Sequence, residues 1–167
     1  MPPKMNCRPF SLVTALTLLV ASVSWGQTGT GLYSFAGGPS DGSFPTAGLV
    51  FDRYGVAYGT TTSGGTYGSG TVFMMSPPTT GNVGWTETVL YNFAGGVDGG
   101  GPFAGVVLDK TGSLYGVTVG GGTGSCYYQG FSGCGTVYKL SPPPNLEVRG
   151  RSRSSMCSLG WTMGPTH

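Results

Sequence analysis

The amino-acid sequence predicts an all-β repeat protein, and three observations support this fold class. Glycine supplies 33 of the 167 residues and proline 12, whereas only 8% of the residues are charged. Short runs rich in Val, Thr, Tyr and Phe alternate with these turn-forming residues, as in strands joined by tight turns. Residues 32–59 (LYSFAGGPSDGSFPTAGLVFDRYGVAYG) recur as residues 90–116 (LYNFAGGVDGGGPFAGVVLDKTGSLYG). A chain that repeats itself is built by stacking similar units.

The N-terminus has the order of a secretory signal peptide. Lys4 and Arg8 precede an apolar run over residues 10–23, and Ser24-Trp25-Gly26 follows it. This charged, apolar, small-x-small pattern predicts a signal peptide over residues 1–26, with cleavage after Gly26. The run is short for a spanning helix, although an uncleaved anchor is the alternative. We therefore expect export to the periplasm, the outer surface or the extracellular space, without a stable membrane span after cleavage.

Each repeat offers a set of strands. Repeat 1 (residues 27–89) predicts strands at 48–52, 56–62, 70–75 and 85–93, the last running into the next copy. Repeat 2 (residues 90–144) predicts strands at 105–109, 113–119 and 135–140. Four strands at a period of 58 residues favour one β-propeller-like blade per repeat, with a β-solenoid as the alternative. Intrinsic disorder is a competing interpretation for a chain so rich in glycine, but its aromatic content opposes disorder.

The aspartates of both repeats fall at expected turns. Asp52 and Gly55 join the first two strands of one repeat, and Asp109 and Gly112 join those of the next. An Asp side chain can accept hydrogen bonds from its own downstream backbone, and Gly supplies the positive φ. Asp41 and Asp98 each precede a Gly in an earlier loop, where a turn role is favoured over calcium binding. We expect no metal and no cofactor at these positions.

The charges argue against two classes of function. Residues 27–144 carry three basic and five acidic side chains, so the repeats lack the basic surface that nucleic-acid binding needs. Most charges also recur at the same place in the next copy, as Asp41 with Asp98, Asp52 with Asp109 and Arg53 with Lys110. A catalytic site gathers different residues at one point, whereas charges that follow a repeat indicate turns and edges. The sequence therefore predicts a protein that is not an enzyme.

Repeat 2 contains an insertion of eight residues that brings Cys126 and Cys134. In an exported chain, two cysteines arriving together in one loop predict a disulfide. Metal binding is the weaker alternative, because no His and no second Cys pair lies nearby in the sequence.

The last residues differ from the repeats. Residues 145–167 contain three Arg, and the Trp85-Thr86-Glu87 sequence does not recur at position 150, where the spacing places it. Shifting the reading frame by one nucleotide permits Trp-Thr-Glu-Thr-Val-Leu-Tyr at that place. We interpret this segment as an out-of-frame translation of a third repeat, with an unrelated basic tail as the alternative. Under this interpretation Cys157, Trp161 and His167 have no functional role.

Residues 32–144 resemble a known repeat. The pattern Leu-Tyr-x-Phe-Ala-Gly-Gly, Asp-Gly, Ala-Gly-Leu-Val-x-Asp, Tyr-Gly-Thr-Thr, Gly-Thr-Val-Phe and Trp-Thr-Glu-Thr-Val is similar to the Gloeo/Verruco (GloVer) tandem repeat. That resemblance implies an exported bacterial repeat protein, and it supplies no catalytic residues. Family members usually carry more copies, so the resemblance implies a truncated form.

Three functional hypotheses follow. The first is an exported, non-catalytic β-repeat scaffold for surface attachment or for binding an extracellular ligand. The second is a fragment of an extracellular glycan-active enzyme, favoured by the Tyr and Trp content. The third is a frameshifted remnant without independent function.

Overall fold

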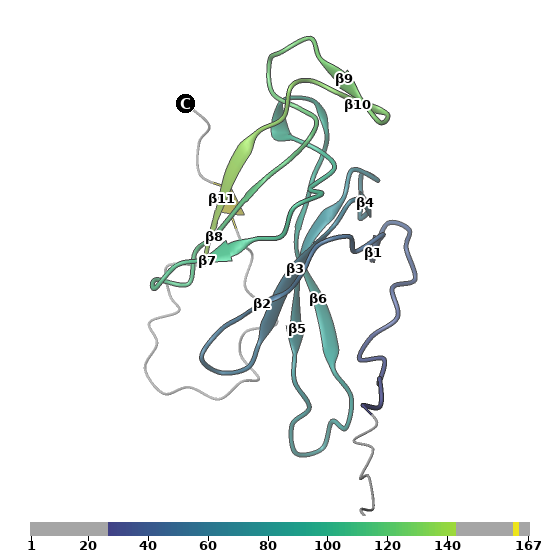
Figure 1. Ribbon diagram of the computed structural model, residues 1–167, viewed down its shortest axis with the longest axis vertical. Helices are drawn as coiled ribbons and strands as arrows, with labels where there is room; N and C mark the ends of the chain where they lie inside the picture. Colours follow the sequence, from purple (N-terminus) through teal and green to yellow (C-terminus); the bar gives the residue numbers. More distant parts are fainter. Residues whose placement is uncertain (1–26, 143–161, 164–167) are drawn as a thin grey trace, which may run out of the picture. The chain divides into compact units, whose positions relative to one another are not determined.

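A computed structural model describes residues 27–142 and 162–163 of this chain. The predicted signal peptide and nearly all of the predicted out-of-frame tail lie outside these residues. Within the unit Gly31–His167, the described residues form two four-stranded and two two-stranded antiparallel sheets (Figure 1). The predicted all-β class is therefore confirmed.

The first sheet belongs to the first repeat. Its order is β2-β3-β5-β6, formed by β2 (Val50–Phe51), β3 (Ala57–Thr61), β5 (Thr71–Ser76) and β6 (Thr86–Asn92). Each strand lies inside one of the predicted segments or extends it by one residue. Within this sheet, each strand pairs antiparallel with the sheet's next strand along the chain. The ladder between β5 and β6 contains a β-bulge at Val72/Phe73.

The second sheet has the same construction. Its order is β7-β8-β11-β12, formed by β7 (Val107–Leu108), β8 (Leu114–Val117), β11 (Val137–Ser141) and β12 (Thr162–Met163). Thr162 pairs with Ser141 as Thr86 pairs with Ser76 in the first sheet. The short strand β12 therefore takes the place of β6.

Four smaller strands and one short helix complete the described residues. β1 (Gly42–Ser43) pairs with β4 (Ser63–Gly64), and β9 (Tyr127–Tyr128) pairs with β10 (Phe131–Ser132). A 3-10 helix, η1, covers Gly96–Asp98. No helix of the described residues is long and apolar enough to cross a membrane.

The sheets and the sequence repeats are out of phase. Strand β6 completes the first sheet, yet its last residues, Leu90 to Asn92, open the second repeat. The predicted boundary between residues 89 and 90 therefore lies inside a strand. The corresponding opening of the first repeat, residues 32–34, belongs to no strand of the described structure. This phase difference matters for the candidate site below.

The main core lies between the two four-stranded sheets. Tyr58, Val72 and Met74 of the first sheet, with Val56 just before β3, pack with Leu114, Tyr138 and Leu140 of the second in one buried cluster. Because side chains alternate along a strand, the opposite face of the first sheet carries Ala57, Phe73 and Met75. These three residues form a separate buried cluster with Phe35 and Trp85 against it.

Glycines inside two strands make room for aromatic rings. Gly59 pairs with Phe73, and the equivalent Gly116 pairs with Tyr138. A Cβ at Gly59 would lie 2.6 Å from the Phe73 ring, and one at Gly116 would collide with the Tyr138 ring. A strand glycine at such a place allows close approach of the opposite side chain.

Candidate binding surface

An apolar groove covers the outward side of the first sheet. Its volume is about 260 Å³, and we call this side the groove face. Its floor is formed by Ala57, Phe73 and Met75, each of which is almost fully buried. Its walls come from the loops and strands that flank the sheet, namely Leu32, Tyr33, Phe35, Pro45, Ala47, Leu49, Phe51 and Trp85.

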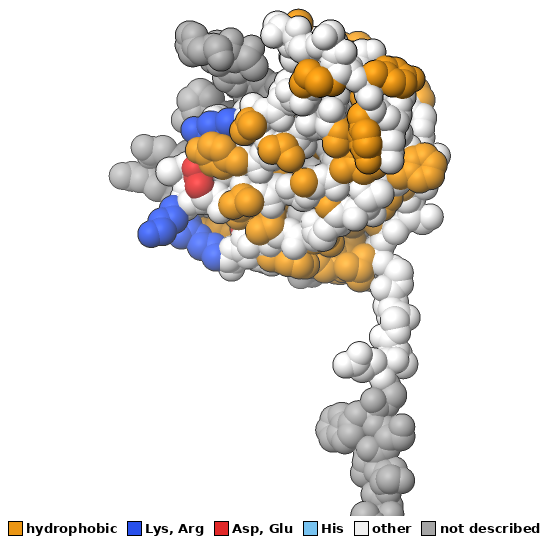
Figure 2. All heavy atoms as spheres, turned by 45° about the horizontal axis from the view of Figure 1, so that its top comes forward, with side chains coloured by type: hydrophobic (Ala, Val, Ile, Leu, Met, Phe, Trp, Pro, Cys, Tyr) orange, Lys and Arg blue, Asp and Glu red, His pale blue; other side chains and the backbone are white. Residues whose placement is uncertain are grey.

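The walls of the groove are exposed although they are apolar. Leu32 is 47% exposed, Leu49 44% and Phe51 54%. Single exposed apolar residues are ordinary, but a contiguous group of them around a groove indicates an interaction site. Figure 2 shows one face of the molecule on which hydrophobic side chains gather and charged ones are few.

An aromatic ladder holds the groove in shape. The Tyr33 and Phe35 rings lie 5.1 Å apart, and the Phe35 and Phe73 rings 5.0 Å apart, both edge to face. Such pairs add about 0.5–1.5 kcal/mol beyond the burial of their area. The ladder fixes residues 32–35 against the sheet even though they form no strand.

Glu87 is the acidic residue of the groove face. It pairs with Met75 between β6 and β5, so both side chains lie on the same side of the sheet. Burial, followed by the nearby Asp41 charge, raises the pKa of Glu87 to about 7. Among the described residues its buried Oε1 atom has no hydrogen-bond partner. Glu87 therefore lies on the same side of the sheet as the groove floor but does not itself line the groove.

The aspartates after the first strand of each sheet are turn residues. Asp52 Oδ1 accepts hydrogen bonds from the Tyr54 and Val56 amides at 2.8 and 2.9 Å. Asp109 Oδ1 accepts from the Thr111 and Ser113 amides at the same two distances. A side-chain hydrogen bond from Thr111 and two backbone ones lower the pKa of Asp109 to about 2. Gly55 and Gly112 close these turns at φ of 79° and 87°.

The loop aspartates also repeat each other's contacts. Asp41 accepts from the Tyr33 hydroxyl at 3.1 Å and the Ala36 amide at 2.6 Å. Asp98 accepts from the Tyr91 hydroxyl at 2.5 Å and the Ala94 amide at 2.7 Å. These bonds tie each loop to the start of its own repeat. All four predicted turn aspartates therefore have their oxygens engaged by their own repeat.

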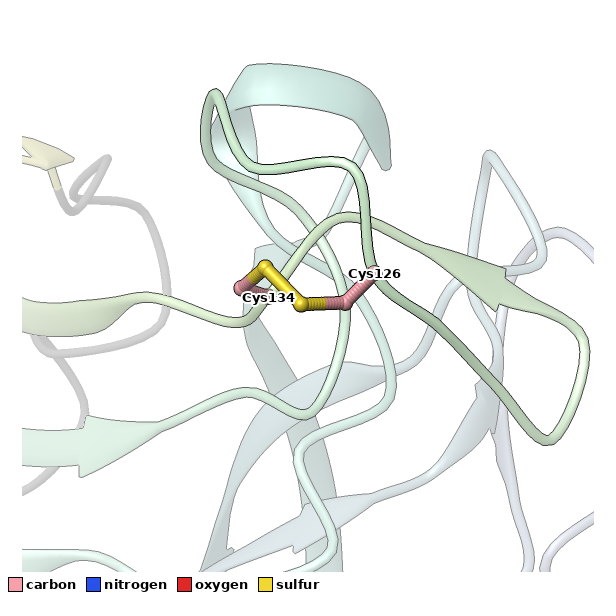
Figure 3. Close-up of a disulfide and its surroundings, with 2 residues drawn as sticks. All are labelled: Cys126 and Cys134. Atoms are coloured by element: carbon pink, nitrogen blue, oxygen red, sulfur yellow. A yellow bond between two sulfur atoms is a disulfide. The ribbon is translucent and has the colours of Figure 1, made fainter.

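The predicted cysteine pair is joined in the structure (Figure 3). The sulfur atoms of Cys126 and Cys134 lie 1.98 Å apart, and their Cα atoms 4.8 Å apart. The bond closes the inserted loop at the base of the β9–β10 hairpin. This hairpin exposes Tyr127 and Tyr128, which have no counterpart in the first repeat.

The groove could not be recognised from the sequence. Tyr33 and Phe35 recur as Tyr91 and Phe93 in the second repeat, and aromatic residues that follow a repeat favour a core role over a binding site. Glu87 carried one available signal, since it lies in a strand without an obvious turn role. Within the described residues, no three His, Cys, Asp or Glu side chains gather to hold a metal ion.

No protein-family model matches this chain, and neither the curated proteins nor the solved structures contain a significantly similar one.

Proposed function

We propose that this protein is an exported, non-catalytic β-repeat scaffold that acts by binding a partner at the groove face. The observation that carries this proposal is that the aspartates of both repeats accept hydrogen bonds within their own turns and loops. Asp41 and Asp98 make the same hydrogen bonds in both repeats, as do Asp52 and Asp109. Carboxylates engaged in turns are not available as an acid and base pair, whereas an open apolar groove suits binding.

The proposed location rests on the disulfide and the N-terminal sequence. Disulfides persist in oxidising compartments and are rare in the cytosol of most organisms. Cys126 and Cys134 are joined, and residues 1–26 have the pattern of a secretory signal. Both observations support export. Intact mass of the purified exported chain tests the cleavage after Gly26.

Each four-stranded sheet is proposed to be one blade-like unit, with a solenoid as the alternative arrangement. Successive sheets of similar order packed face to face support the first interpretation. The same proposal places the chain among GloVer-like repeat proteins, on the motifs of residues 32–144. Such a chain would be a shortened member of an array.

The binding proposal is tested with the groove altered and the fold intact. Leu49→Asp puts a charge on the groove wall, and Val83→Asp puts one on the β5–β6 loop, where Val83 is 98% exposed. Surface extracts, glycan arrays and the chain itself serve as targets. Capture that is lost in L49D and kept in V83D supports the proposal. Turnover of a glycan or peptide substrate by the wild-type chain contradicts the non-catalytic assignment.

Glycan binding is a second candidate function, and the β9–β10 hairpin favours it. Tyr127 is 75% exposed and Tyr128 55%, on a loop that the disulfide restrains. Exposed tyrosines on a rigid support can stack on sugar rings at small entropic cost. Loss of glycan-array signal in a Tyr127→Ala, Tyr128→Ala chain would support this candidate. A cooperative unfolding transition of the secreted chain argues against a remnant without function.

A further inference from the structure

The partner of the groove face can be inferred from the second repeat. The groove residues of the first repeat have equivalents in the second, and those equivalents are covered. Leu32 is 47% exposed and its equivalent Leu90 9%; Leu49 is 44% exposed and its equivalent Val106 7%. The ring pair Phe35–Phe73, 5.0 Å apart, corresponds to Phe93–Tyr138, also 5.0 Å apart. The same surface therefore exists twice, once open and once buried.

The structure shows what covers the buried copy. The inward face of the first sheet, with Tyr58, Val72 and Met74, packs against it in the main core. The equivalent face of the second sheet carries Tyr115, Val137 and Lys139. These residues occupy the register positions that Tyr58, Val72 and Met74 occupy in the first sheet. We call this the far face; Val107 and Val117 also belong to it. All of its apolar members are exposed, with Val137 at 77%.

Two unmatched halves of one interface therefore lie on the same chain. Among residues 27–142 and 162–163, no sheet covers the groove face and no apolar surface packs against the far face. The equivalents of these two faces already pack against each other inside the chain, where they form the main core. An interface between two different patches is heterologous, and it leaves a free patch at each end of every assembly.

Charge favours the same pairing. Glu87 lies on the groove face with an unsatisfied Oε1 atom. The far face carries Lys139, which occupies the position of the apolar Met74 in the first sheet. Its ammonium lies 5.4 Å from the centre of the Tyr115 ring. Docking of the two faces places the face that carries Lys139 in one chain against the face that carries Glu87 in the next.

The strand edges agree as well. In the first sheet, Val72 pairs with Tyr91 at the start of the second repeat. In the second sheet, β12 pairs with Leu140 and Ser141 of β11. Among the described residues, the earlier part of β11, which includes Val137, pairs with no strand on that side. Val137 is the equivalent of Val72, and Tyr33 of a second copy is the equivalent of Tyr91. Residues 32–34 of that copy can therefore extend the second sheet as a strand.

We propose that this protein associates head to tail with further copies of itself, the groove face of one chain docking on the far face of the next. The interface repeats the packing that the two sheets make inside one chain. The inference rests on the proposed scaffold function and names the partner of its groove. Its failure is distinguishable, because a groove that binds a different partner leaves the scaffold function standing.

Sedimentation velocity of the secreted chain over a dilution series from micromolar to near-millimolar concentration tests the proposal. Wild type is expected to form concentration-dependent oligomers. Leu49→Asp on the groove face and Val137→Asp on the far face are each expected to weaken association more than about tenfold, because each buries an unpaired charge. Val83→Asp, on neither face, is the matched control and is expected to associate as wild type.

Mixing the two variants gives the decisive result. Each retains one intact face, so an equimolar mixture of L49D and V137D is expected to form a one-to-one dimer that grows no further. Charge reversal gives a second route if either variant fails to fold. Glu87→Lys and Lys139→Glu each weaken association, and their mixture restores one contact. A monomeric wild type, or a mixture that does not associate when both variants are folded, overturns the proposal.

Discussion

The two repeats of this chain present nearly the same residues to different surroundings. Leu90, Phe93 and Val106 of the second repeat are buried, whereas Leu32 and Leu49 at the equivalent positions of the first are open. Their ring contacts are alike, because the Tyr91–Phe93 rings lie 5.2 Å apart and the Tyr33–Phe35 rings 5.1 Å apart. Their backbones differ, since residues 90–92 lie in β6 and residues 32–34 in no strand. Whether a repeated residue is buried therefore depends on which surface packs against it and not on the residue's own type.

The repeats also share a polar contact at the same end of the two central strands of each sheet. Thr61 and Thr71 hydroxyls lie 2.8 Å apart, and so do those of Thr118 and Thr136. In each pair the first threonine donates to a backbone carbonyl two residues later. These contacts survive the eight-residue insertion, because it lies between the strands and not within them.

The largest difference between the two repeats is expected when their equivalent phenylalanines, Phe93 and Phe35, are truncated. Phe93→Ala removes a fully buried ring that contacts Tyr91 and Tyr138, and we expect the free energy of unfolding to fall by about 3–5 kcal/mol. Phe35→Ala is expected to cost about half as much, because its groove is already open to water. Denaturant unfolding at a concentration where the chain is monomeric measures both. Equal losses would contradict the difference in burial.

Removing the disulfide tests the feature that one repeat has and the other lacks. The double variant Cys126→Ala, Cys134→Ala is expected to lose about 2–3 kcal/mol, because opening a short loop restores entropy to the unfolded chain. Reducing agent should lower the stability of the wild type by a similar amount and leave the variant unchanged. An unchanged midpoint in the double variant would show that the hairpin unfolds independently of the sheets.

Two equivalent glycines, one in each repeat, are expected to show the same loss of stability when replaced by alanine. Gly70 and Gly135 adopt φ of 98° and 93°, and a Cβ at either would collide with a backbone carbonyl, of Thr61 or Thr118. We expect Gly70→Ala and Gly135→Ala each to lower the free energy of unfolding by more than about 1 kcal/mol. Gly81→Ala is the control, since its φ is 92° but its surroundings are open. A control as damaging as the two variants would rule out the collision as the cause.

Glu87 gives the smallest expected effect and the most specific one. Its folded-state pKa of about 7 lies above the ordinary value of 4.5, so folding favours the protonated form. The stabilising contribution is therefore fully present below pH 4.5 and is lost as the pH rises to about 7. Glu87→Gln should flatten the stability profile in this window. The difference between the two profiles is measured by thermal unfolding, and parallel profiles would contradict the shift.

Much of the fold could be predicted from the sequence, because its strands carry local signals. The seven predicted segments cover β2, β3, β5, β6, β7, β8 and β11, except that β5 and β11 each extend one residue beyond the predicted end. The strands β1, β4, β9 and β10 were not predicted, since two-residue pairs in glycine-rich loops have no periodicity. Strand β12 does have a signal in the sequence, because Gly160-Trp161-Thr162 repeats Gly84-Trp85-Thr86 in the frame as written. The out-of-frame interpretation stays a prediction, and the nucleotide sequence tests it.

The candidate site divides in the same way. The disulfide and the turn aspartates follow from short-range chemistry, since Cys126 and Cys134 are close in sequence and Asp52 bonds its own turn. The groove depends on which face of the first sheet the second one covers, and no local pattern encodes that choice. Phe73 and Tyr138 read alike along the chain, yet one lies under an open groove and the other inside the core.

The all-β class, the positions of the longer strands, the turns and the pairing of the cysteines follow from the amino-acid sequence. Each of these depends on residues that are neighbours along the chain or on a pattern with period two. The tertiary structure alone decided that one copy of a repeated surface is covered and the other open. The reason is physical: an apolar face is buried only when a second surface lies against it, and the first sheet has two faces but one neighbouring sheet among the described residues.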